Sequence, residues 1–479
     1  MNFRDIKFGK TDAQIESLEY PQLLVDGYFN TTNIVERATD KTTFLFLGYK
    51  GSGKSALSEH LKLSNSDCMV DQIRLKDFPY NSLGNILTGE AEKEVKIKVA
   101  WRWLLLAYVL NSLKDDSTAN CTMPEDLNKA IDLLTQTGIF PLTSISNLVT
   151  KTTTSTFKAS LKAFSYERTT HRENTQVSFY YAIDYIKKLI GSFKENHNHL
   201  IVIDGLDEIL TTRDIQYVAI ASLINEVKDL NTFFLIHNIT VKIIVLCRTD
   251  IFERLPDPNK NKIRQDCSFS FSWYNEGLDD QSHCDLVKLA NLRTKMRFPR
   301  VNDMFDTFFP KRYKNKIIAT ALLEYTRHTP RDFLQLLNCI QSQCRQDHVD
   351  YIAISNGLKL YSTEYFLPEI KDEMSGYIPA DNIDEIINVF SVMRCREFEY
   401  KEFEALYREN PILSDLPIDN VLKLLFDCSA IGQKYPYKDG SNGNKTRITF
   451  KYRNRNSSIK KTDKFILHKG LWKALNINF

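Results

Sequence analysis

The sequence has no strong excess of either charge. Its 63 basic and 60 acidic residues leave a formal net charge of +3 over 479 residues, so no field of the whole molecule would draw a polyanion to it. Its nine cysteines are an odd number, and they form neither a C-x-x-C pair nor a His/Cys cluster at zinc spacing. A disulfide framework and a zinc ribbon are therefore not expected, and reduced, mostly buried thiols are.

Long apolar segments are also missing. The longest, Trp103–Leu110, is too short to cross a bilayer. The first residues, Met1–Lys7, resemble neither a signal peptide nor a transit peptide, and no internal repeat or coiled-coil heptad is present. Hydrophobic residues make up 43 % of the chain, ample for the cores of about two to four domains. These features predict a cytoplasmic globular protein with no membrane partner.

A phosphate-binding loop is the most specific motif that the sequence contains. Residues Gly48–Ser55 read Gly-Tyr-Lys-Gly-Ser-Gly-Lys-Ser and follow directly on the apolar run Phe44–Leu47. The pattern G-x-x-x-x-G-K-[ST] thus stands between a predicted strand and a predicted helix, where its chemistry requires it. Glycines let backbone N–H groups turn inward around a triphosphate, and the helix points its positive end at the same anion. The residues predicted to contact the nucleotide are Gly48, Gly51, Ser52, Gly53, Lys54, Ser55 and Ala56.

A second motif contains carboxylates that could bind Mg²⁺ and activate the attacking water. Residues Leu200–Ile203 are four apolar β-formers, which indicates a strand buried on both faces, and Asp204 ends it at the ligand edge of an α/β sheet. Asp204 is the natural Mg²⁺ partner opposite the Ser55 hydroxyl. Asp207 and Glu208 follow on the loop, where either carboxylate could orient or deprotonate the attacking water. The alternative is that both acids simply complement a helix dipole.

A third predicted strand, Lys242–Cys247, ends in Arg248, Thr249 and Asp250. Its tip should lie beside the strand that ends in Asp204, so Arg248 or Thr249 could sense the γ-phosphate. The alternative is that Arg248 pairs with a structural acid.

A cation is also predicted at the start of a later helix. Thr329 suits the N-cap and Pro330 the first helical position. Arg331 then lies near the positive end of the helix dipole, which is unfavourable unless an anion is close by. A phosphate would be such an anion.

The order of these motifs resembles the AAA+ and STAND branches of the P-loop ATPases, including the origin-recognition and Cdc6-like initiators and the NACHT-type switch ATPases. The likeness covers most of the segments 1–84 and 180–345. It implies an ATPase with ATP and Mg²⁺ as cofactors. The residues that it assigns are Lys54 and Ser55 (Walker A), Asp204 (Walker B), Arg248 (sensor 1) and Arg331 (sensor 2).

One departure from this pattern concerns the rate of hydrolysis. Many AAA+ enzymes carry Glu directly after the Walker B acid, where this chain has Gly205. The run Asp-Gly-x-Asp-Glu is the STAND style, and a slow nucleotide-gated switch fits it at least as well as fast turnover. Sites of this type are commonly completed by an arginine of a neighbouring subunit, and Arg254 and Arg264 are candidates. A homo-oligomer is therefore expected.

The fold class that follows is α/β, a P-loop NTPase with a parallel sheet. The core spans residues 1–275 with a helical insertion at about 85–180, and a helical lid follows at 276–370. Residues 375–479 have the outline of a winged helix. Its predicted elements are helices at 383–390, 400–407 and 419–428 and strands at 446–452 and 464–468.

The basic charge is concentrated in the tail. Residues 433–479 hold 12 basic and 2 acidic side chains, a local charge of +10. The loop Arg453–Lys461 could lie along phosphates, which makes nucleic acid the leading partner. An acidic protein, or a wing that is merely solvated, would account for the same charge. The basic and aromatic stretch 158–172 leaves the same choice open.

These predictions combine into an ATPase that acts as a nucleotide-gated switch or motor on nucleic acid. Analogy with lone-standing STAND ATPases suggests a setting in bacterial defence against phage or mobile elements. No nuclease, protease or deaminase constellation is present, so an effector would be a separate chain. The alternative is a non-catalytic, ATP-loaded regulatory scaffold that oligomerises and recruits a partner protein.

Overall fold

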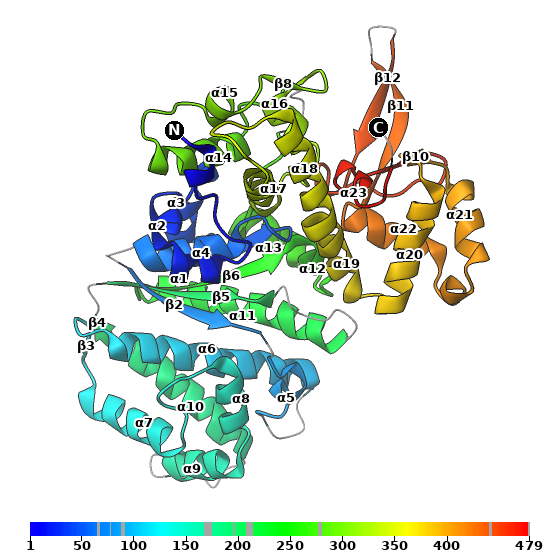
Figure 1. Ribbon diagram of the computed structural model, residues 1–479. Coiled ribbons are helices and arrows are strands. Elements are labelled where there is room, and N and C mark those ends of the chain that lie inside the picture. The colour runs from blue at the N-terminus through cyan, green and yellow to red at the C-terminus, as the bar shows by residue number, and fades with distance from the viewer. Residues whose placement is uncertain are drawn as a thin grey trace. The chain divides into compact units, whose positions relative to one another are not determined.

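A five-stranded parallel sheet forms the centre of one of the two units into which the chain divides in the computed structural model (Figure 1). Unit 1 comprises Met1–Thr31, Gly51–Gly53 and Ser272–Phe479, and unit 2 comprises Thr32–Lys50 and Lys54–Phe271. The structure describes residues 1–64, 68–76, 78–87, 92–166, 175–194, 197–206, 214–275, 280–439 and 443–477. In this described part, no helix is both long and apolar enough to cross a membrane.

The sheet of unit 2 has the order β2-β5-β6-β1-β7, and every neighbouring pair is parallel. Helix α4 (Lys54–Ser64) covers one face and helix α11 (Asp214–Ile236) the other (Figure 1). This arrangement confirms the predicted α/β class with a parallel P-loop NTPase sheet. The strands are β1 (Leu45–Gly48), β2 (Cys68–Arg74), β5 (Asn198–Asp204), β6 (Val241–Arg248) and β7 (Ser268–Ser270).

The three central strands are continuously apolar because both of their faces are covered. The side chains of Leu45–Leu47, Leu200–Ile203 and Ile243–Cys247 are all at most 2 % exposed. β6 lies beside β5, as the sequence predicts, with Ile203 opposite Val245. Its other neighbour is β1, with Gly48 opposite Arg248. The carboxyl ends of β1, β5 and β6 therefore share one edge of the sheet, where open α/β sheets bind their ligands.

The predicted insertion between β2 and β5 is helical. Trp101 in α6 donates its indole N–H to the carbonyl of Ala219 in α11 at 2.9 Å, and Arg102 Nε donates to Glu226 at 2.6 Å. These contacts fasten the insertion to the helix that covers the sheet. Of the basic stretch 158–172, residues from 167 onward lie outside the described part. The main helices are α6 (Lys93–Asp115), α7 (Pro124–Gln136), α8 (Ile145–Thr152), α9 (Ser155–Tyr166) and α10 (Thr175–Ile190).

The segment of unit 1 that is predicted to be a lid, residues 276–370, is mainly helical. A small antiparallel hairpin, β8 (Arg312–Tyr313) and β9 (Lys316–Ile317), lies between α15 and α16. The first residues of the chain join this core: Phe3 is fully buried, and its ring centroid lies 5.7 Å from that of Phe308. The helices are α14 (Asp285–Arg297), α15 (Met304–Phe308), α16 (Ile318–Leu323), α17 (Pro330–Ser342), α18 (Tyr351–Tyr361) and α19 (Leu367–Ser375).

The C-terminal part of unit 1 combines three helices with an antiparallel sheet of order β10-β13-β11-β12. Helices α20 (Ala380–Met393), α21 (Tyr400–Glu409) and α22 (Ile418–Asp427) lie where the apolar spacing predicts them. β12 begins and ends three residues earlier than expected, and the sequence does not predict β10 and β11. The assignment of this segment as a winged helix stays a prediction. The strands are β10 (Glu397–Phe398), β11 (Ile431–Asp439), β12 (Gly443–Thr449) and β13 (Lys464–Leu467).

Candidate nucleotide-binding site

The loop between β1 and α4 has the backbone that its glycines predict. The backbone angle φ is +79° at Gly51 and +99° at Gly53, in the left-handed region that glycine favours. A Cβ at Gly51 would also lie 3.0 Å from the Cβ of Arg331 and 3.2 Å from the Oγ1 of Thr329, all within unit 1. A side chain at Gly51 would therefore strain the loop in two ways at once.

Lys54 opens helix α4 and turns its ammonium back over the loop. Its Nζ donates hydrogen bonds to the carbonyls of Gly48 and Tyr49, both at 3.2 Å. The residue is only 4 % exposed, so the charge sits in a partly desolvated position at the end of β1. Ser55 and Ala56 follow in the first turn of the helix and are partly exposed.

Ser52 provides a direct indication that the loop suits a phosphate. The residue is 3 % exposed, and its Oγ has no hydrogen-bond partner among the described residues. Its carbonyl is held by the indole N–H of Trp273 at 2.9 Å, another contact within unit 1. A buried hydroxyl without a partner costs free energy. A phosphate oxygen would satisfy it, so the loop fits the nucleotide that the motif predicts.

Asp204 ends β5 at the same edge of the sheet as Gly48. Its Oδ1 accepts a hydrogen bond from the backbone N–H of Gly205 at 2.8 Å. At Gly205, φ is +86°, and a Cβ there would lie 3.1 Å from the backbone nitrogen of Leu75 and 3.3 Å from that of Lys76. The positive φ and the close approach of the chain after β2 disfavour a glutamate directly after Asp204.

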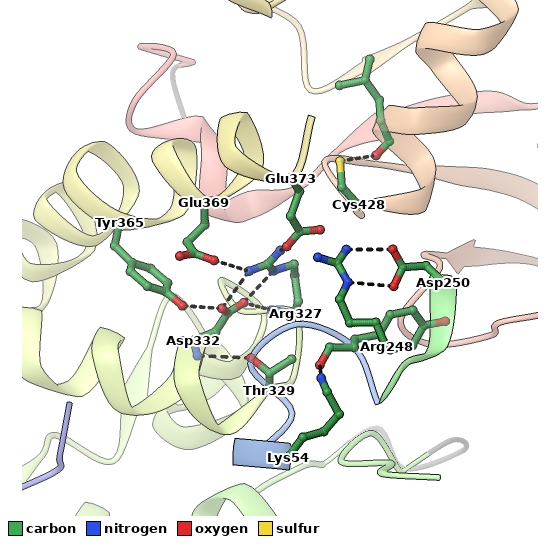
Figure 2. A network of polar contacts seen from close by, with 12 residues as sticks. Lys54, Arg248, Asp250, Arg327, Thr329, Asp332, Tyr365, Glu369, Glu373 and Cys428 are labelled. Atoms are coloured by element: carbon green, nitrogen blue, oxygen red, sulfur yellow. Dashed lines mark hydrogen bonds and ion pairs between the residues drawn. The ribbon is translucent and has the colours of Figure 1, made fainter. Parts of the chain in front are cut away.

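Arg248 forms a bidentate ion pair with Asp250. Its Nε and one terminal nitrogen lie 2.9 and 2.8 Å from the two carboxylate oxygens (Figure 2). Burial by itself would raise the pKa of Asp250, but the charge and hydrogen bonds of Arg248, with the charge of Arg254, together lower it. The sequence leaves open whether Arg248 senses phosphate or pairs with an acid, and the structure shows such a pair at the tip of β6.

The start of α17 is built as the sequence predicts. Thr329 is the N-cap, and its Oγ1 accepts from the N–H of Asp332 at 3.2 Å. Pro330 occupies the first helical position. The backbone N–H of Arg331 donates to the carbonyl of Gly51 at 3.3 Å. Within unit 1, the structure thus brings the predicted sensor arginine against the centre of the phosphate loop.

A buried ion-pair network, which the sequence does not predict, holds this helix start. The guanidinium of Arg327 bonds both oxygens of Asp332, through Nε at 2.9 Å and a terminal nitrogen at 3.0 Å (Figure 2). Its other terminal nitrogen bonds Glu373 of α19, and the Tyr365 hydroxyl donates to Asp332 at 2.8 Å. Burial by itself would raise the pKa of Asp332, but the charge and hydrogen bonds of Arg327, with the hydrogen bond from Tyr365, together lower it to about 2.

The predicted site residues thus form two sets, each within its own unit. In unit 2, Gly48, Asp204 and Arg248 share the carboxyl edge of the sheet, and Lys54 and Ser55 open the helix after β1. In unit 1, Gly51–Gly53 lie with Thr329 and Arg331.

Of the remaining predicted residues, Asp207 and Glu208 lie outside the described part of the chain. Arg264, one of the two candidates for a role in a neighbouring subunit, is paired with Glu253. Arg254, the other candidate, is close enough to Asp250 to help lower the pKa of that carboxyl.

Comparisons with known proteins do not assign this chain to a family. No family model matches the chain, and a search of curated protein sequences finds no match. Among solved structures, the chain is similar to the ORC1 protein of Aeropyrum pernix, determined in complex with DNA. The identity is 10 %, the TM-score is 0.39, and the match covers 91 % of this chain and 92 % of that one. A likeness of this quality carries no functional argument, so the assignment depends on the strand order, the motifs and the site geometry.

Proposed function

We propose that this chain binds ATP with Mg²⁺, hydrolyses it, and works as a nucleotide-gated switch or motor on nucleic acid. The observation that carries the proposal is the loop between β1 and α4. Its two glycines have positive φ, its lysine is buried, and the Ser52 hydroxyl has no partner among the described residues. These features meet at the end of a parallel strand and the start of a helix, where phosphate groups bind.

Each residue of the loop has a defined task in this proposal. The Lys54 ammonium would exchange its carbonyl contacts for the β- and γ-phosphates, and the Ser55 hydroxyl and the Asp204 carboxylate would hold the metal. When bound, Mg²⁺ neutralises charge on the phosphate oxygens. Arg331, whose backbone touches Gly51, is the residue of the lid segment best placed to respond to the γ-phosphate.

Residue 205 is a glycine, and its positive φ and close backbone neighbours disfavour a side chain there, so the acid that prepares the water comes from elsewhere. Asp207 and Glu208 are the carboxylates that follow, and we assign the role to one of them. Arg248 can turn its Nε and the paired terminal nitrogen to the γ-phosphate only by leaving Asp250, and an exchange of this kind favours a slow, gated cycle over continuous turnover.

The C-terminal sheet supports the choice of nucleic acid. In the β11–β12 hairpin, Tyr435 lies opposite Arg447, and Tyr437, two residues along the same face, is 40 % exposed. Alternating rings and cations suit bases and phosphates. In the loop after β12, Arg455, Lys460 and Lys461 are exposed.

Arg453 does not share the phosphate-binding role predicted for that loop. Its guanidinium lies 5.3 to 5.5 Å from the ring centroids of Tyr274, Phe450 and Tyr452. It therefore serves as a structural cation within unit 1.

Two parts of the prediction have no separate support. A homo-oligomer completed by Arg254 or Arg264, and a setting in bacterial defence with a separate effector, stay predictions. The alternative, an ATP-loaded scaffold without turnover, would bind nucleotide tightly and show no affinity for nucleic acid.

Isothermal titration with ATP and Mg²⁺ tests the proposal. Lys54→Ala should abolish binding, because the backbone of the loop cannot replace the lysine charge. Lys62→Ala, a matched change at an exposed position in the last turn of α4, should bind as the wild type does. Wild-type affinity in Lys54→Ala would show that the loop is not a nucleotide site.

A further inference from the structure

A cavity of about 500 Å³ opens on the surface of unit 1. Its wall is built by the chain between β7 and α14, by β9 and α16, by the turn before α17 and by the loop after β12. Among the described residues of this wall, none belongs to the loop Gly48–Ser55. A volume of this size is typical of sites that bind small molecules. We call this space the α16 cavity.

Arg453 brings a cation to the wall of the α16 cavity. Three aromatic rings hold its guanidinium in place, and its Nε donates to the Tyr452 hydroxyl at 3.1 Å. Its two terminal nitrogens donate no hydrogen bond to any residue that the structure describes. Because the rings already fix the side chain, an anion that binds these nitrogens would order little that is not ordered before.

The two described acids of the wall are already engaged with other groups. Each carboxylate oxygen of Glu324 binds one lysine. Asp280 accepts hydrogen bonds from the Thr320 hydroxyl at 3.0 Å and from a backbone N–H at 2.9 Å. The charge of Glu324 acts on Arg453, but no ion pair joins the two. The wall thus lacks an acceptor for the terminal nitrogens of Arg453, and a carboxylate or a phosphate would supply one.

His328 adds a second polar group to the same wall. The residue is 5 % exposed, and its Nδ1 has no hydrogen-bond partner in the described part of the chain. Burial, and then the charge of Arg453, lower the pKa of the imidazole to about 3, so the ring is neutral near pH 7. A neutral imidazole donates through one nitrogen and accepts through the other. A ligand with a second polar group would offset the free-energy cost of the unpaired nitrogen.

Two residues of the wall adjoin the segments that contact the phosphate loop within unit 1. Tyr274 follows Trp273, whose indole N–H donates to the carbonyl of Ser52 at 2.9 Å. His328 precedes the N-cap of α17, and a backbone N–H of that helix start donates to the carbonyl of Gly51 at 3.3 Å. The Tyr274 and His328 rings also meet, with centroids 5.0 Å apart. A ligand that displaces either ring would therefore act on the segments that hold Gly51 and Ser52.

We propose that the α16 cavity binds a small anion through Arg453, and that the bound anion changes the affinity of the phosphate loop for ATP. The ligand class is a small molecule that carries a carboxylate or a phosphate together with a second polar group. The coupling to ATP rests on the proposed nucleotide site, whereas the binding of the anion does not. Because such coupling is reciprocal, ATP changes the affinity for the anion by the same factor.

The first experiment titrates two probes, succinate for a carboxylate and inorganic phosphate for a phosphate. The full chain carries Lys54→Ala, so that phosphate does not bind at the phosphate loop. Arg453→Gln removes the cation, and Ile317→Trp places a large ring at the wall, where Ile317 is 40 % exposed. The matched control is Ile412→Trp, because Ile412 is 51 % exposed in unit 1 and does not line the cavity. Melting temperatures establish that each variant is folded.

At least one probe should bind with a dissociation constant of about 1 mM or lower, and the probe that binds identifies the acidic group of the ligand. Arg453→Gln and Ile317→Trp should each weaken that binding by about tenfold or more, since a hydrogen bond to a charged group is lost or blocked. Ile412→Trp should not change it. If Arg453→Gln does not fold, Ile317→Trp decides alone. The anion site is refuted if neither probe binds, or if the two tryptophan variants bind the probe equally well.

The second experiment measures the affinity for ATP in chains that keep Lys54, with and without a saturating concentration of the probe. The probe should change the ATP dissociation constant by about fivefold or more. Ile317→Trp at the same probe concentration should remove that change, and this comparison cancels any competition of phosphate at the loop itself. An ATP affinity that responds to the probe equally in Ile317→Trp and Ile412→Trp would overturn the coupling. A chain that binds the probe but never ATP would refute the proposed nucleotide site and the coupling, and it would confirm the anion site.

Discussion

Replacing Arg327 by methionine tests whether the buried network at the start of α17 stabilises the lid segment. The Arg327, Asp332 and Glu373 side chains are 6 %, 0 % and 9 % exposed. Methionine retains an unbranched apolar stem but removes the charge and every donor. The carboxylates would then be buried without a counter-charge, and Asp332 would keep the hydrogen bonds from Tyr365 and from the backbone N–H of residue 327. Removing one member of a buried ion pair costs about 3–5 kcal/mol.

The pH dependence of this effect has a definite sign. The unfolded carboxyl of Asp332 has a pKa near its usual 3.8, and the folded one has a pKa of about 2. The folded value is the lower, so the network contributes stability above about pH 4 and loses it as the pH falls toward 2. The difference corresponds to roughly 2 kcal/mol. The deficit of Arg327→Met relative to the wild type should therefore be largest at neutral pH and shrink in acid.

Amide hydrogen exchange is the suitable assay, because a chain of two units need not unfold in one step. Near neutral pH, protection in α17 and α19 should fall by at least tenfold in Arg327→Met, since about 1.4 kcal/mol corresponds to a factor of ten. The control is Arg408→Met, which breaks an ion pair with Glu404 whose side chains are 74 % and 26 % exposed. That change should cost less than about 1 kcal/mol. Equal protection in α17 for the two variants would refute the reasoning.

Three further substitutions test the site. Gly51→Ala should lower ATP affinity by about tenfold or more, since φ at this residue is +79° and the new Cβ would lie 3.0 Å from the Cβ of Arg331. Gly84→Ala is the control, because a Cβ there meets open space, and it should not change the affinity. Equal ATP affinities for the two variants would contradict the role of the loop backbone. Gly205→Ala should destabilise unit 2 by about 1–2 kcal/mol, measured as the exchange of β5 amides, and unchanged exchange would contradict the strain. Asp207→Asn or Glu208→Gln should slow turnover in a phosphate-release assay with ATP binding intact, and two variants at the wild-type rate would remove both acids from the mechanism.

The features that the sequence predicts are those encoded by neighbouring residues. The phosphate loop, the strand ending in Asp204 and the N-cap at Thr329 each occupy a short run, and local chemistry decides their conformation. The neighbouring position of β5 and β6 also follows, because strands buried on both faces must lie inside the sheet. Such features are found from the pattern alone.

Contacts between residues far apart in the chain leave no such pattern. Arg327 lies 46 residues before Glu373, and nothing in the spacing indicates that the two meet. The packing of Phe3 against Phe308 spans a longer separation still. β11 escapes prediction for a local reason: Pro436 stands in its middle, and proline argues against a strand in which every N–H must pair.

Residue 205 shows how structure and chemistry constrain each other in this chain. A glutamate there would need a backbone that a side chain tolerates, yet φ is +86° and the backbone after β2 approaches within 3.1 Å of the position of a Cβ. The same approach makes a hydrogen bond, because the N–H of Leu75 donates to the carbonyl of Asp204 at 2.9 Å. Glycine at this position therefore secures the end of β5, which carries the proposed metal ligand. In our proposal the carboxylate that prepares the water must then come from further along the chain, from Asp207 or Glu208, and the substitutions at those two residues test that assignment.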